Sequence, residues 1–99
     1  MAAALKMDPP DAVWLRLAID TRRKEIADVD TELVRLIRKR VVAARQLGNL
    51  KSEAGLPIAQ PAQEKAVLTR WREAAGELDP TAIERVAGIV IALCREAHG

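Results

Sequence analysis

The stretch RKRVVAARQLGNLK, Arg38 to Lys51, decides how the chain folds, because an apolar helical stripe passes through it. Counted in alternating steps of three and four residues, this stripe, the seam, consists of Ile26, Val29, Leu33, Leu36, Arg40, Ala43, Leu47 and Leu50. Such spacing is typical of a helix that packs along a second helix. Arg40 stands where the pattern predicts a leucine, so a permanent charge lies in a surface that should be buried.

The sequence around this stretch predicts one very long helix. Residues 12–53 contain no proline and a single glycine, Gly48, and Asp11 precedes them as a candidate N-cap. We therefore expect a helix of about 40 residues, roughly 60 Å long. A chain of 99 residues is too small to cover such a helix alone, so we expect a homodimer.

Two shorter helices are predicted after a loop. Gly55 and Pro57 interrupt the first helix, and Pro61 is well placed to begin a second helix that runs to about residue 75. Asp79 caps a third helix, which begins at Pro80 and continues to the end of the chain. The prediction is an all-α chain of three helices, with residues 1–11 as a flexible extension and residues 12–99 as one domain.

Composition limits the possible partners. Residues 22–51 contain nine Lys or Arg and four Asp or Glu, a net charge near +5, which indicates an anionic partner. Phe and Tyr are absent, and no nucleic-acid-binding motif is present, so nucleic acid is the weakest candidate. No apolar run approaches the roughly 20 residues of a membrane span. With one cysteine and no convincing signal peptide, we expect a soluble cytoplasmic protein.

Arg40 and Lys51 form the candidate binding site. They are eleven residues apart, which places them on one helix face about 16 Å apart. Between them, Ala44 and Gly48 have almost no side chain, so two cations bracket a hollow, and guanidinium groups suit a dicarboxylate. Arg23 lies near the same face, but about 25 Å from Arg40, so it reaches this ligand only from an antiparallel second copy.

Each of these residues also has a structural interpretation. Arg40 is equally suited to pair with a carboxylate on another helix, and Lys51 near a helix C-terminus favours the helix dipole in any case. The remaining basic residues of this region are expected to form a solvated face: Arg22, Arg35, Arg38, Lys39 and Arg45. His98 and Cys94 alone are too few to bind a metal. A helical dimerisation or regulatory module without catalysis therefore remains an alternative.

The segment RRKEIADVDTELVRLIRKRVVAARQLGNLKSEAGLPI, residues 22–58, resembles the first helix and loop of the all-helical chorismate mutases. The resemblance extends over about residues 15–98. It implies an intertwined homodimer of three-helix chains that rearranges chorismate to prephenate for aromatic amino acid biosynthesis and uses no cofactor or metal.

The resemblance also assigns roles to four residues. Arg40 and Lys51 would bind the substrate carboxylates together with Arg23 of the other chain. Lys51 would also contact the ether oxygen of the breaking C–O bond. Glu64 matches a glutamate that accepts a hydrogen bond from the substrate ring hydroxyl.

Four further site positions differ from the family pattern or match it only in size. Gln60 stands where relatives often have an acid, and Gln63 where they often have an arginine. Cys94 occupies a small-residue substrate position, and His98 replaces a glutamine that donates to the ether oxygen. These departures leave two other substrates open, isochorismate for a pyruvate lyase and 4-amino-4-deoxychorismate for a mutase.

Overall fold

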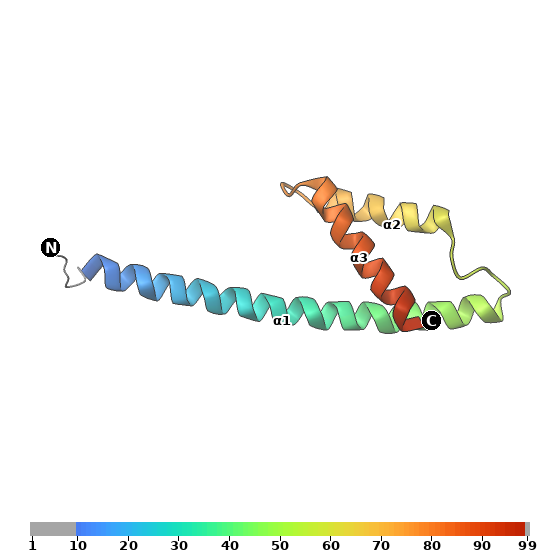
Figure 1. Ribbon diagram of the computed structural model, residues 1–99, viewed down its shortest axis with the longest axis horizontal. Coiled ribbons are helices and arrows are strands. Elements are labelled where there is room, and N and C mark those ends of the chain that lie inside the picture. The colour runs from blue at the N-terminus through green and yellow to red at the C-terminus, as the bar shows by residue number, and fades with distance from the viewer. Residues whose placement is uncertain (1–9, 99) are drawn as a thin grey trace. The chain divides into compact units, whose positions relative to one another are not determined.

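The computed structural model describes the backbone of residues 10–98 and the side chains of residues 11–96. It contains three helices, α1 (Pro10–Glu53), α2 (Pro61–Ala74) and α3 (Pro80–His98) (Figure 1). No strand occurs between residues 10 and 98. The predicted all-α class and the order of one long and two shorter helices are therefore confirmed.

Helix α1 has 44 residues and begins two residues earlier than predicted. Pro10 is its first residue, and Asp11 lies in its first turn instead of capping it. Proline is tolerated at the first helical position because the N–H that it lacks would have no partner inside the helix. Residues 1–9 of the predicted extension lie outside the described residues, and the domain boundary stays a prediction.

Glycines follow both α1, as expected, and α2. After α1, the Gly55 N–H donates to Ser52 O at 3.2 Å and the Leu56 N–H donates to Lys51 O at 2.8 Å. This pair of bonds is the Schellman motif, which requires a left-handed residue, and Gly55 has a φ of 70°. Gly76 follows α2 with a φ of 61°. Both turns use the conformation that glycine adopts without steric cost.

The predicted start of α3 is also confirmed. The Thr81 N–H donates to Asp79 Oδ1 at 3.1 Å, so Asp79 caps the helix and satisfies one of its unpaired N–H groups. Helix α2 begins at Pro61, as predicted, after Gln60 in an extended conformation. The Gln60 side chain makes no capping hydrogen bond.

The chain divides into two compact units, residues 1–36 and residues 37–99. The described part of the first unit belongs entirely to α1. In the second unit α2 and α3 pack against each other, and the most buried side chains are Ala75, Ala87, Val90 and Cys94. Ion pairs join Glu64 to Arg95 and Arg72 to Glu84. Because the first residues of α2 pair with the last residues of α3, the two helices are antiparallel.

The large apolar residues of the seam are exposed in the single chain. Their exposed fractions lie between 46% and 61% for Ile26, Val29, Leu33, Leu36, Leu47 and Leu50. So much aligned aliphatic surface is unusual for a chain without a partner. The homodimer stays a prediction, and the surface that it requires is present. Among the described residues, no helix is both long and apolar enough for a bilayer span.

Candidate functional site

Arg40 connects α1 to α3. Its side chain is half-buried, and Nη1 donates a hydrogen bond to Cys94 Sγ at 3.0 Å. No carboxylate of residues 11–96 forms an ion pair with Arg40, so the expected alternative, a purely structural pair with another helix, does not occur there. A sulfur atom is a weak acceptor, and a guanidinium has five N–H donors. The contact with Cys94 thus uses one of the five N–H donors of Arg40.

Lys51 lies in the last turn of α1, on the loop side of the site. Its Nζ donates to the backbone oxygen of Ile58 at 3.1 Å, so the side chain leans toward the loop between α1 and α2. The ammonium has three N–H donors, and this bond uses one of them. The contact orients the charge without neutralising it, because its acceptor is a carbonyl oxygen.

The helix between the two cations is lined by small residues. Residues 40–51 are helical throughout, so Arg40 and Lys51 lie on one face about 16 Å apart along the axis. Ala44 is half-buried and Gly48 is buried. The predicted helix and the shared face of the two cations are therefore confirmed, and the hollow between them and its role as a binding site stay predictions.

Helix α2 contributes the neutral and acidic groups predicted for the site. Glu64 lies in the first turn of α2, where a negative charge is favoured by the helix dipole, and its carboxylate pairs with Arg95 of α3. Gln60 is half-buried at the N-cap, and Gln63 is exposed. All three belong to the same compact unit as Arg40 and Lys51.

Helix α3 contributes Cys94, which is only 6% exposed and touches Arg40. The backbone of His98 forms the last residue of the helix, and its side chain lies outside the described residues. Arg23 belongs to the other unit and is exposed. The roles of His98 and Arg23 stay predictions.

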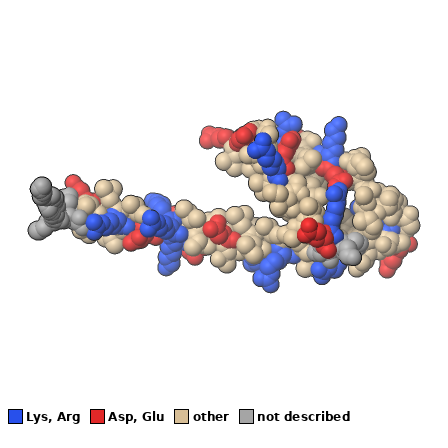
Figure 2. All heavy atoms as spheres, in the orientation of Figure 1, with Lys and Arg blue, Asp and Glu red and all other residues tan. Residues whose placement is uncertain are grey.

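The remaining basic residues of α1 match the expected solvated face. Arg22 pairs with Glu25 at 2.6 Å, and Arg35 pairs with Glu32, each one helical turn apart on the exposed surface. The hydrogen bond from Arg35 lowers the pKa of Glu32 and raises the pKa of Arg35. Figure 2 shows Lys and Arg side chains interspersed with Asp and Glu along the visible face. Such exposed pairs add little to stability.

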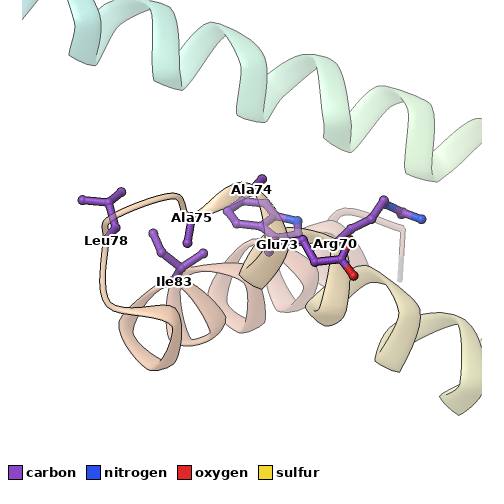
Figure 3. Close-up of a pocket in the computed structure, with 7 residues that line it drawn as sticks. Arg70, Glu73, Ala74, Ala75, Leu78 and Ile83 are labelled. Carbon is purple, nitrogen blue, oxygen red and sulfur yellow. The ribbon is translucent and has the colours of Figure 1, made fainter.

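A shallow hollow lies away from this site, at the C-terminal end of α2 (Figure 3). It is lined by Arg70, Trp71, Glu73, Ala74, Ala75, Leu78 and Ile83. None of the predicted site residues lines it. No polar cluster converges on it that would orient a dicarboxylate, so the cationic face of α1 remains the better candidate.

Sequence reasoning missed Arg95. Its pair with Glu64 depends on the antiparallel packing of α2 on α3, which brings the start of one helix beside the end of the other. Glu64 stands four residues after Gln60, and Arg95 follows Cys94 directly. Opposite charges at these two ends indicate a pair once the helices are known to be antiparallel.

Comparison with known proteins identifies the family to which the chain belongs. The model of the family described as chorismate mutase type II matches residues 22–99. Over 48 residues the chain is 40% identical to the bifunctional chorismate mutase/prephenate dehydratase of Aquifex aeolicus. The aligned segment covers 48% of this chain and 13% of that protein. It is 33% identical over 51 residues to the chorismate mutase of Methanocaldococcus jannaschii, which covers 52% of each.

A third relative, the T-protein of Haemophilus influenzae, is 41% identical over 55 residues, which covers 56% of this chain and 15% of that protein. The chain thus aligns with about half or less of the length of these curated relatives. No solved structure gave a significant match. Because the family match covers most of its length, the chain belongs to the chorismate mutase type II family.

Proposed function

We propose that the chain is an active chorismate mutase, an isomerase that rearranges chorismate to prephenate. The observation that carries the proposal is the position of Arg40 and Lys51 on one face of α1, with Ala44 and Gly48 between them. The family match over residues 22–99 supports it.

Arg40 and Lys51 would bind the two substrate carboxylates. Arg40 now donates to a sulfur, and a carboxylate is a far stronger acceptor for a guanidinium. Ligand binding would therefore form a charge-assisted hydrogen bond to Arg40 and break only the weak hydrogen bond to Cys94 Sγ. Lys51 keeps donors for the ligand while its bond to Ile58 O holds it in place.

The reaction needs no nucleophile. The rearrangement is unimolecular, so the protein has to hold the enolpyruvyl group folded over the ring, which is a task of positioning. It also has to stabilise the negative charge that grows on the ether oxygen as the C–O bond lengthens. Fixed cations do this selectively, because the charge is larger in the transition state than in the substrate. Lys51, and His98 by family resemblance, would serve that oxygen.

The working unit in this proposal is a cytoplasmic homodimer. The exposed seam would be covered by a second copy, and Arg23 of that copy would join Arg40 and Lys51 at one ligand. Gln60, Gln63 and Cys94 would line the substrate, and Glu64 would accept from its ring hydroxyl. The seam, the cations and the small residues then all serve one shared site.

The direct test is incubation of the purified protein with chorismate and, separately, with isochorismate. We expect prephenate from chorismate and no salicylate or pyruvate from isochorismate. Salicylate with pyruvate would instead identify an isochorismate-pyruvate lyase. If neither substrate reacts, 4-amino-4-deoxychorismate distinguishes the amino mutase from a non-catalytic dimerisation module.

The shared site predicts complementation between two inactive variants. Arg23→Ala and Arg40→Ala should each lose most activity and remain folded. After subunit exchange, an equal mixture should recover about a quarter of wild-type activity, because half of the dimers are mixed and each contains one intact site. Lys24→Ala and Lys39→Ala, which remove exposed neighbouring charges, serve as controls. If mass spectrometry shows exchange and no activity returns, Arg23 does not act across the interface.

Lys51→Ala should lower kcat by about a hundredfold or more, with a smaller change in KM. The reason is that a donor aimed at developing charge contributes mainly in the transition state. Arg45→Ala removes an exposed cation from the same helix and should leave both constants unchanged. Steady-state kinetics with chorismate decide the matter. A normal kcat with a raised KM would mean that Lys51 only anchors a carboxylate.

A further inference from the structure

Two ion pairs join α2 to α3, one near each end of the antiparallel helices. In one, Arg72 of α2 pairs with Glu84 of α3 at 3.1 Å. In the other the charges are reversed, and Arg95 of α3 pairs with Glu64 of α2. The two pairs are similarly exposed, with 58% and 35% for Arg72 and Glu84 and 55% and 33% for Arg95 and Glu64. Their contributions to stability should therefore be alike and small.

The surroundings of the two pairs differ. Arg72 and Glu84 lie at the end of the helices that borders the α2–α3 turn. Arg95 follows Cys94, whose sulfur accepts the hydrogen bond from Arg40. One turn of α3 thus contacts the binding cation of α1 through Cys94 and the carboxylate of α2 through Arg95.

We propose that Arg95 is a positioning residue that aims the Glu64 carboxylate at the substrate ring hydroxyl, an inference that rests on the proposed function. A guanidinium can hold one carboxylate oxygen and leave the other lone pairs available to accept from the ligand. On α2, Gln63 is neutral and exposed and Lys65 forms no ion pair with Glu64, so the cation that pairs with this carboxylate comes from α3.

The role predicts a particular kinetic effect. The ring hydroxyl takes no part in bond making or breaking, so its contact is equally strong in the substrate and in the transition state. Loss of such a contact raises KM and leaves kcat almost unchanged. Arg95→Ala should raise KM for chorismate about tenfold, within the range expected for one charged hydrogen bond. Arg95→Lys, which keeps the charge, should restore part of the loss.

The test combines matched controls with a double-mutant cycle. Arg95→Ala and Arg72→Ala should shift the urea midpoint by similar small amounts, and only Arg95→Ala should change KM. Glu64→Gln should raise KM on its own, and Arg95→Ala should add little in that background, because it acts through Glu64.

Each outcome is decisive. Equal KM for wild-type protein and Arg95→Ala, or independent effects of Arg95→Ala and Glu64→Gln, would overturn the inference while the chorismate mutase assignment stands. An equal rise in KM for Arg72→Ala would show that both pairs act only on helix packing and would overturn it too. Absence of turnover by the wild-type protein would overturn the proposed function and this inference together.

Discussion

Arg40 Nη1 donates to Cys94 Sγ at 3.0 Å, and through this contact the C-terminal part of α1 meets α3. A half-buried guanidinium has lost part of its hydration, and a sulfur acceptor replaces little of it. A leucine at this position would continue the apolar seam, so we expect Arg40 to lower the stability of the ligand-free chain. In the proposed function, an anionic ligand would compensate for this loss of hydration.

The other elements of the proposed site lie in the same compact unit as Arg40. Ala44 and Gly48 are the small residues between Arg40 and Lys51, and in the loop that follows the Schellman turn Ile58 O accepts a hydrogen bond from Lys51 Nζ. The antiparallel packing of α2 on α3 then brings Glu64 into the same unit. In the proposed function a dianion would bind Arg40 and Lys51, and cations that are held in place before the reaction stabilise developing negative charge most effectively.

Most of the fold was predictable because its signals are local. Gly55, Gly76 and the Asp79 cap set the helix ends through bonds between residues close in sequence. The shared face of Arg40 and Lys51 was predictable because helical geometry fixes it. The Glu64–Arg95 pair was not, because it depends on how α2 packs against α3, which no local pattern specifies. The predicted start of α1 was wrong by two residues, because Pro10 occupies the first helical position, where proline is tolerated.

The central claim, that Arg40 is kept for a dianionic ligand at the expense of stability, is tested most directly by urea unfolding of Arg40→Leu at fixed chain concentration. We expect the ligand-free variant to be more stable than wild type by about 1–2 kcal/mol, since a well-packed apolar residue often replaces a buried charge favourably. Saturating prephenate should raise the unfolding midpoint of the wild-type protein and leave that of Arg40→Leu unchanged, because only a chain that binds the ligand is stabilised by it. A variant that is less stable than wild type and still responds to prephenate would contradict the account.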